Sequence, residues 1–317
     1  MLGKRIRRKS YLAMKSLELL YRRGSAVGRT LPNVFILGAT KSGSTSLTLM
    51  LWNHPAHVPA FAKELMYLQQ LPQFISAWEF HPVPAFLCGR YENGHAKYNL
   101  GGYKKFFPLK LTMATRAARH GGRAITSDCD PINLYCPVAT QRIKDFADDP
   151  RFIVSLRNPI DRTYSDFNMA FTRDRTERRS FEECIEDEMA GRYKNFHKRY
   201  LYQSIYEPHL RRWIDAFGRD RFLIINAEQF FSNPAKVVSQ MFRFLGLADV
   251  PVNMSPGNVG KYSSEMKDET RQRLREFFHP HNEALRDLLG WAHDLDAGWN
   301  ESRPELKPTW SGFQQAR

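Results

Sequence analysis

The sequence predicts an α/β fold in which one P-loop-like parallel sheet is covered by helices on both faces. Short apolar, β-branched or aromatic runs indicate four buried strands, at 34–37, 123–126, 152–156 and 222–225. Segments with helical spacing follow or separate them, and this alternation implies parallel crossover units. These segments span 44–53, 109–120, 138–147, 158–172, 181–190, 205–217 and 234–245. Chemistry in such sheets lies at the carboxyl ends of the strands.

Length and composition favour a single domain. Of 317 residues, 42% are hydrophobic, which is enough for a sizeable core, and no repeat or linker divides the chain. We expect a basic N-terminal segment at 1–30, one domain at 31–295 and a tail at 296–317. The four cysteines form no C-x-x-C pair. We therefore expect neither a zinc site nor a disulfide framework. We expect the protein to lie in a reducing compartment, the cytoplasm.

The positive charge is concentrated at the N-terminus. Residues 1–30 hold nine Lys and Arg against one Glu, which is +8 of the net +14, and leave +6 for the rest. Apolar residues are mixed with these bases, as in a basic amphipathic helix that lies on an anionic membrane, here the inner face of the cell membrane. A solvated helix packed on the domain explains the pattern equally well. No run approaches the ~20 apolar residues of a spanning helix.

The stretch at 33–51, NVFILGATKSGSTSLTLML, combines an apolar run, a Gly/Ser/Thr loop and a helical segment. This order brings backbone N–H groups and a helix N-terminus to one anion. Gly38 and Gly43 have the spacing of a nucleotide-triphosphate loop, in which a lysine follows the second glycine. Here Ser44 follows Gly43 and the lysine, Lys41, lies inside the loop. The stretch therefore indicates a phosphate-binding loop with a displaced charge.

A second anion-binding candidate follows the run at 152–156. Arg157 ends this run, Asn158 and Pro159 open a helix, and Ser165 lies two turns further on. The planar fork of an arginine suits a phosphate, and the hydroxyl of Ser165 would bind the same oxygens. Alternatively, Arg157 pairs with Asp161 and Ser165 is a surface residue.

GATKSGSTSL and SLRNPIDRTYSDF together resemble the two nucleotide motifs of sulfotransferases that use 3′-phosphoadenosine-5′-phosphosulfate (PAPS). HPAHVPAFAKELMYL resembles a stretch of the glycan enzymes, heparan-type ones included. FLIINAEQFFSNPAKVVSQMFRFLGL and the segment from NVGKYSSEMK to LLGW are similar to later parts of the family. The resemblance covers about 32–291 and implies the sulfotransferase fold.

The resemblance also implies site residues, with PAPS as co-substrate and no metal. Glu64 falls where the heparan-type enzymes place their catalytic base. Arg157 and Ser165 would hold the 3′-phosphate. The 5′-phosphosulfate would be surrounded by Lys41, Ser42, Gly43, Ser44, Thr45 and Ser46. The nucleotide would be closed over by Gly260, Lys261 and Tyr262.

One departure from the heparan-type pattern concerns the residues after the second predicted strand. A Glu-Lys-Ser/Thr-Pro run is replaced by Asp128, Cys129, Asp130 and Pro131, so the lysine is missing. Two acids near the acceptor argue against a polyanionic acceptor. Asp128 and Asp130 are also competing candidates for the base.

The expected reaction is an in-line transfer of a sulfuryl group. Lys41 would neutralise charge on the leaving oxygen, and Glu64 would accept a proton from the acceptor. The acceptor is expected to be a hydroxyl or amine of a glycan or glycolipid, with a small alcohol as another option.

Two other functions remain open. A P-loop kinase or ATPase is disfavoured by the position of Lys41 and by the absence of an acidic magnesium motif after an apolar strand. The second alternative function is that of a basic protein that binds membrane or nucleic acid through residues 1–30. A nucleic-acid role is not expected, because +6 over the remaining 287 residues does not require a basic stripe.

Overall fold

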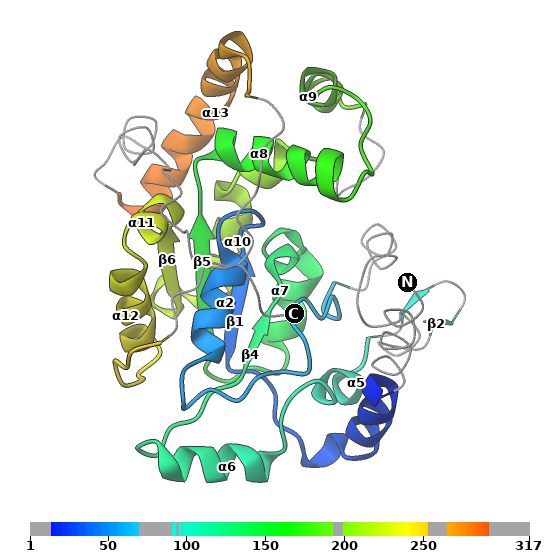
Figure 1. The fold of residues 1–317 in the computed structure, drawn as a ribbon, viewed down its shortest axis with the longest axis vertical. Coiled ribbons are helices and arrows are strands. Elements are labelled where there is room, and N and C mark those ends of the chain that lie inside the picture. The colour runs from blue at the N-terminus through cyan, green and yellow to red at the C-terminus, as the bar shows by residue number, and fades with distance from the viewer. Residues whose placement is uncertain are drawn as a thin grey trace, which may run out of the picture.

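The computed structural model describes residues 14–69, 91–92, 95–96, 98–192, 199–252 and 265–291. Its centre is a four-stranded sheet in the order β4-β1-β5-β6, and every neighbouring pair is parallel. Figure 1 shows the strands upright with helices around them. The strands are β1 (Val34–Gly38), β4 (Ser127–Cys129), β5 (Arg151–Leu156) and β6 (Phe222–Asn226), with a separate antiparallel pair β2 (Tyr91–Glu92) and β3 (His95–Ala96).

The seven segments predicted to be helical are helical in the structure, whereas the helices at 100–104, 227–232 and 268–289 were not predicted. Residues 14–24 are also helical. The α-helices are α2 (Ser44–Trp52), α5 (Leu100–Lys104), α6 (Lys110–Arg119), α7 (Pro137–Lys144), α8 (Pro159–Asn168), α9 (Phe181–Met189), α10 (Glu207–Phe217), α11 (Ala227–Ser232), α12 (Pro234–Phe244) and α13 (Asp268–Leu289). Short 3-10 turns are η1 (Ala26–Gly28), η3 (Pro131–Tyr135), η6 (Tyr202–Ser204) and η7 (Arg219–Arg221), and η4 (Met169–Arg173) is π-helical.

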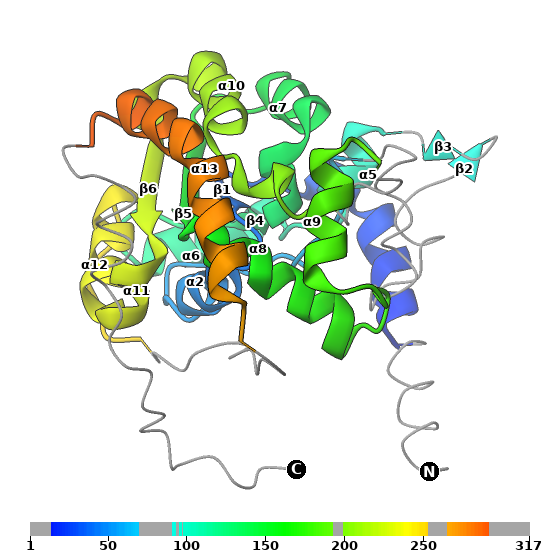
Figure 2. The ribbon, with the colours of Figure 1, turned by 90° about the horizontal axis from the view of Figure 1, so that it is seen from above.

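Two apolar layers sandwich the sheet, because alternate residues of each strand point to opposite faces. In β1, Val34 and Ile36 pack with α2 and α12, whereas Phe35 and Leu37 pack with α7, α10 and α13. Figure 2, which looks from above, shows these helix groups on the two sides of the strands. Every residue of β1 is buried. The continuous apolar runs of the sequence are thus explained by burial on both faces.

The position predicted for the strand at 123–126 is wrong by a few residues. The sheet strand is β4 at Ser127–Cys129, and Ile125 instead forms an isolated parallel bridge with His57. The apolar, β-branched residues therefore mark the approach to the sheet. The polar residues Ser127 and Asp128 pair with β1, and each side chain forms a hydrogen bond inside the protein, with His57 and Tyr103 respectively.

In the order β4-β1-β5-β6, the strands that follow β1 lie on both of its sides, so the point at which the strand order reverses lies between β1 and β5. The chain passes from β1 to β4 on one side and returns to β5 on the other. Ligands bind at such a switch point, outside the carboxyl ends of the strands. Among the described residues, no helix is long and apolar enough to span a bilayer.

Candidate functional site

The two predicted anion-binding stretches meet at the carboxyl ends of β1 and β5. Ala39 N–H donates to Ser155 O at 2.7 Å and prolongs the pairing of these strands. Ser155 Oγ then donates to Ser42 O at 2.7 Å, and Arg157 Nη1 donates to Lys41 O at 3.3 Å. Residues more than 110 positions apart in sequence are therefore tied into one unit.

The loop between β1 and α2 turns through two residues with left-handed backbone, Lys41 (φ 65°) and Gly43 (φ 82°). A Cβ at Gly43 would lie 2.9 Å from Cε1 of Phe231, so glycine is required there for space as well as for φ. No side chain caps α2 at Gly43. The first-turn N–H groups of a helix lack partners in the helix and carry its positive dipole end. This end of α2 can therefore receive an anion.

Most serines of the loop are buried and help to build it. Ser42, Ser44 and Ser46 are buried, whereas Thr45 is half-buried. Ser42 N–H donates to Ala39 O at 3.3 Å, so this amide is used within the loop. The cradle is accordingly formed by the backbone of the first turn of α2 more than by the serine hydroxyls.

The Lys41 side chain reaches from the loop towards the end of α8. Its Nζ lies 3.3 Å from Sδ of Met169, the first residue of η4. A thioether is a weak acceptor, so this contact holds the ammonium in place at little cost in affinity for an anion. Isolated π-helical turns are frequent at functional sites.

Arg157 lies where the sequence predicts, half-buried after the end of β5. Its guanidinium carbon is 5.9 Å from the ring centroid of Phe231. The alternative partner, Asp161, pairs with Arg271 of α13 at 3.1 Å. Ser165 is only 7% exposed on α8, so the alternative in which it is a surface residue is wrong.

Asn158 shapes the turn that follows Arg157. Its Oδ1 accepts from the N–H groups of Ile160 and Asp161 and caps α8. Its own N–H donates to Glu228 Oε1 at 2.9 Å. The Asn-Pro pair is therefore a helix start, with a capping side chain at the first position and proline just inside.

Arg162 is a site residue that the sequence analysis missed. It is completely buried and donates to Ser204 Oγ (2.6 Å), Thr40 Oγ1 (2.7 Å) and Tyr200 O (2.8 Å), and it pairs with Asp166 at 3.3 Å. The network fixes Thr40, the residue before Lys41. An arginine four residues before an aspartate in the predicted helix was the available signal.

Glu64 lies beside the end of β4, on the other side of β1. Its N–H donates to Cys129 O at 3.0 Å, and its backbone is left-handed at φ 56°. The carboxylate is about half exposed, at 46%, and pairs with Lys63. Lys41 and Glu64 are two of the four described non-glycine residues with positive φ, a costly conformation that clusters at functional sites.

Asp128 and Asp130 are fully buried, unlike Glu64. Tyr103 OH donates to Asp128 Oδ2 at 2.5 Å, and burial together with the charge of Asp130 raises the pKa of Asp128 to about 7. The Asp130 carboxylate accepts from Met66 N–H at 2.7 Å and Ile132 N–H at 3.3 Å. Burial and the charge of Glu64 also raise the pKa of Asp130. These contacts favour structural roles for both aspartates.

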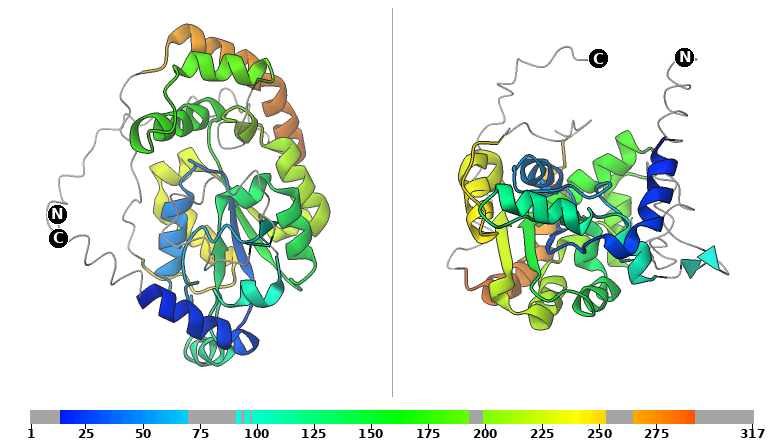
Figure 3. Two further views of the ribbon diagram at one scale, coloured as in Figure 1. Left: turned by 90° about the vertical axis from the view of Figure 1, so that its right-hand side faces the viewer. Right: turned by 90° about the horizontal axis from the view of Figure 1, so that it is seen from below.

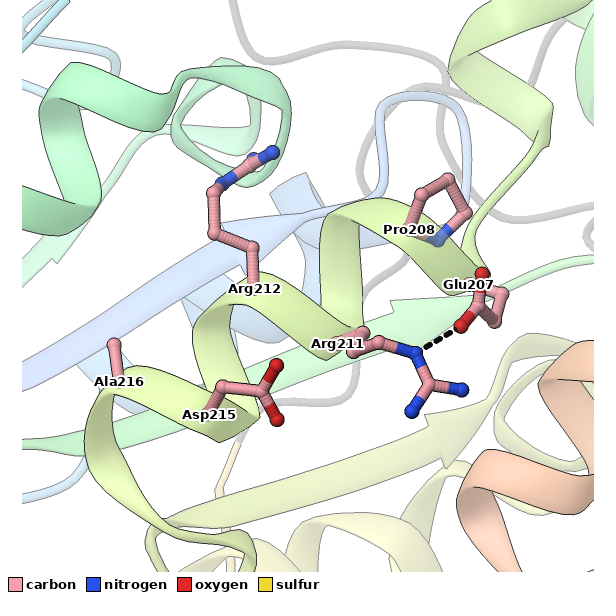
Figure 4. Close-up of a pocket in the computed structure, with 6 residues that line it drawn as sticks. All are labelled: Glu207, Pro208, Arg211, Arg212, Asp215 and Ala216. Carbon is pink, nitrogen blue, oxygen red and sulfur yellow. Dashed lines mark hydrogen bonds and ion pairs between the residues drawn. The ribbon is translucent and has the colours of Figure 1, made fainter.

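A surface depression along α10 lies apart from these residues (Figure 4). Arg211 in it is paired with Glu207, and Arg212 donates to Leu134 O at 2.7 Å. Its charges are therefore partly compensated. It is lined by Glu207, Pro208, Arg211, Arg212, Asp215 and Ala216.

Two further expectations concern closure and metal. Gly260, Lys261 and Tyr262 lie outside the described residues. Within the described part of the chain, no group of three or more His, Cys, Asp or Glu is placed to hold a metal ion.

Known proteins resemble this chain in sequence and in fold. Residues 32–251 match the model of the sulfotransferase family. Heparan sulfate glucosamine 3-O-sulfotransferase 3A1 from Homo sapiens is 24% identical over 309 residues, which cover 90% of this chain and 66% of that protein. Bifunctional heparan sulfate N-deacetylase/N-sulfotransferase 1 from Mus musculus is 24% identical over 291 residues, which cover 81% of this chain and 29% of that protein. The chain thus spans less than two thirds of either relative.

A solved structure gives the same fold. The crystal structure of a sulfotransferase from Alicyclobacillus acidocaldarius superimposes with a TM-score of 0.62 at 26% identity, covering 86% of this chain and 99% of that one. The predicted sulfotransferase fold is therefore confirmed.

Proposed function

Because the chain belongs to the sulfotransferase family, we propose that it transfers the sulfuryl group of PAPS to a hydroxyl or amine of a carbohydrate acceptor. The observation that carries the proposal is the hydrogen bond from Arg157 Nη1 to Lys41 O at 3.3 Å. It joins an uncapped helix start with its lysine to an arginine on the neighbouring strand. One nucleotide with phosphates at both its 3′ and 5′ positions would fit this pair of cationic groups.

The residues present suit PAPS. Its 5′-phosphosulfate would lie at the N-terminus of α2, where the helix dipole favours negative charge. Its 3′-phosphate would bind the guanidinium of Arg157, with Ser165 as a further donor. When bound, PAPS supplies an activated sulfuryl group whose transfer leaves negative charge on a phosphate oxygen.

Lys41 and Glu64 divide the chemistry in this proposal. The Lys41 ammonium would stabilise the negative charge that develops on the leaving side. The half-exposed Glu64 carboxylate would accept the acceptor proton, because an acceptor can reach it, whereas the Asp130 carboxylate is buried and bonded to backbone amides. Lys41 follows β1, and Glu64 is bonded to Cys129 at the end of the neighbouring strand β4, so both lie at the carboxyl end of the sheet.

The acceptor is proposed to be a carbohydrate, since both named relatives act on heparan sulfate by their names. The argument from Asp128 and Asp130 against a polyanionic acceptor loses force in the structure. Both carboxyls are buried, and their pKa values are raised, so they present little negative charge to the surface. The proposed acceptors therefore include both neutral and anionic glycans.

The nucleotide assignment is tested by thermal unfolding with ligands. We expect 3′-phosphoadenosine-5′-phosphate without metal to raise the Tm in a concentration-dependent manner, and ATP with magnesium to raise it much less. Stabilisation by ATP and magnesium alone would overturn the proposal in favour of a kinase or ATPase.

The acceptor is tested separately by transfer of radiolabelled sulfate from PAPS. Polysaccharide and lipid fractions of the cell envelope are offered to the wild-type protein and to Lys41→Ala. Label that enters polysaccharide with the wild-type protein alone supports the proposal. Label that enters only lipids without a sugar would overturn the carbohydrate assignment while leaving the nucleotide assignment intact.

A further inference from the structure

The helix at 14–24 turns its charged face towards the protein. Lys15 Nζ lies 4.5 Å from the ring centroid of Phe61, and the guanidinium carbon of Arg22 lies 5.3 Å from it. Glu18 is held between them, at 2.9 Å from Lys15 and 2.8 Å from Arg22. Arg22 also donates to the carbonyl of Phe106 at 3.5 Å. The ion pairs lie within the helix, and the helix is docked through the cation–π contacts of Lys15 and Arg22, the bond from Arg22 to Phe106 and the buried side chain of Leu19.

The opposite face of this helix is apolar and exposed. The exposed fractions are 58% for Met14, 69% for Leu17, 59% for Leu20 and 62% for Tyr21, whereas Leu19 is buried at 3%. A surface helix normally turns its apolar stripe inward and its charges outward. Because this helix exposes four of its five large apolar residues and turns Lys15 and Arg22 inward, its outward face is suited to an apolar phase outside the domain.

Helix α6 extends the same surface. Arg29, which follows η1, forms an antiparallel bridge with Leu109, and Thr30 N–H donates to Pro108 O at 3.0 Å. Exposed apolar residues lie on both sides of this junction, with Val27 at 89% and Leu111 at 77%. In the view from below, helix 14–24 and α6 occupy the near face together (Figure 3, right).

The charge around this apolar surface is positive. Helix α6 has no buried residue and carries Lys110, Arg116 and Arg119 without an acid. In the sequence, the 13 residues before the helix add five bases and no acid. Basic groups at the border of exposed Leu, Met and Tyr match a bilayer with anionic headgroups over apolar chains, where each basic residue near the surface adds attraction.

We infer that helix 14–24, η1 and α6 form a docking surface for an anionic lipid bilayer. Leu17, Leu20 and Tyr21 would enter the boundary between headgroups and acyl chains, and the bases would bind the headgroups. The inference is independent of the proposed transfer reaction, because none of these residues belongs to the candidate site.

The test is co-sedimentation of the full chain with lipid vesicles. We expect binding to phosphatidylcholine vesicles in which about a third of the lipid is phosphatidylglycerol, little binding to pure phosphatidylcholine, and weaker binding at about 0.5 M salt. Leu17→Ser combined with Leu20→Ser should lower the partition coefficient at least about tenfold, since two buried apolar side chains are lost. Lys110→Glu combined with Arg119→Glu should lower it several-fold, about the effect of a few surface charges.

The matched control is Leu49→Ser, an exposed leucine on α2 (42% exposed) outside the surface. It should bind vesicles like the wild-type protein, and all variants should keep the wild-type Tm within a few degrees. Equal binding of wild type and the Leu17/Leu20 variant would overturn the inference. So would a wild-type dimer in sedimentation velocity that this variant converts to monomer without any vesicle binding, because the apolar face would then cover a second copy.

Discussion

The ends of β1 and β5 carry cations that remain half-exposed, whereas the end of β4 carries two carboxyls that are buried completely. At the cationic end, the core holds the backbone: Ser155 and Arg157 donate to loop carbonyls, and the charged groups stay accessible. At the acidic end, the carboxyls themselves are the ties, to Tyr103 and to backbone amides. Charge near a strand end is therefore available to a ligand where it stays half-exposed, and is part of the fold where it is buried.

The largest effect is expected for Lys41→Ala. Sulfuryl transfer should fall on the order of 10³-fold, because one preorganised cation is lost where negative charge develops. Affinity for 3′-phosphoadenosine-5′-phosphate, measured by calorimetry, should fall much less. Lys236→Ala, an exposed lysine on α12, is the control. Equal losses in turnover and affinity would mean that Lys41 binds ground state and transition state alike.

A smaller loss is expected for Glu64→Gln, which keeps the shape but removes the proton acceptor. Turnover should fall at least about 100-fold, as for the loss of a general base, with unchanged nucleotide affinity. Exposed Glu276→Gln on α13 should be neutral. Near-normal turnover of Glu64→Gln, together with a loss of turnover in Asp128→Asn, would assign the base to the buried Asp128. It would contradict the conclusion that the buried carboxyls have no part in catalysis.

Arg157→Ala is expected to weaken the binding of the 3′-phosphate alone. Affinity for 3′-phosphoadenosine-5′-phosphate should fall about 10- to 100-fold, since a charge-assisted contact is lost, while affinity for AMP, which has no 3′-phosphate, should change little. Arg151→Ala, at the opposite end of the same strand, is the control. If both ligands lose affinity equally, Arg157 acts by holding the Lys41 carbonyl.

The smallest effect concerns stability at the acidic end. The pKa of Asp128 is raised to about 7 in the folded protein, mainly by burial, so its neutral form is favoured there. Its contribution to stability is complete below the unfolded pKa of about 4 and is lost as the pH rises through about 7.

Compared with Asp128→Asn, which cannot ionise, the wild-type Tm should therefore rise by a few degrees as the pH falls from about 8 to about 5. Circular dichroism melts at several pH values measure this difference. Asp287→Asn, whose side chain is 76% exposed, should show no such trend. A pH-independent difference between wild type and Asp128→Asn would mean that Asp128 stays ionised.

The loop after β1 and the arginine after β5 were predictable because local sequence determines both: a buried apolar run, a glycine with positive φ, and an Asn-Pro helix start. The start of β4 was not, since its polar residues are stabilised by long-range partners such as His57 and Tyr103. Arg162 was missed for the same reason. Its donors reach segments about 40 and 120 residues away.

Left-handed backbone at Lys41 and Glu64 could not be foreseen either. Neither is a glycine, and the surrounding contacts hold the strained conformation. Lys41 is held by Arg157, and Glu64 is held by the carbonyl of Cys129.

The junction of Arg29 with Leu109 lies just before β1, at the amino ends of the strands, whereas the Lys41 loop lies at their carboxyl ends. Figure 1 shows α6 below the sheet and the turn between β1 and α2 at the upper end of β1. A chain docked on a bilayer through helix 14–24 and α6 would thus hold its transfer site at the end of the sheet that faces away from the lipid. Short glycolipid headgroups would be out of reach, and long or freely diffusing sugar chains would be the accessible acceptors.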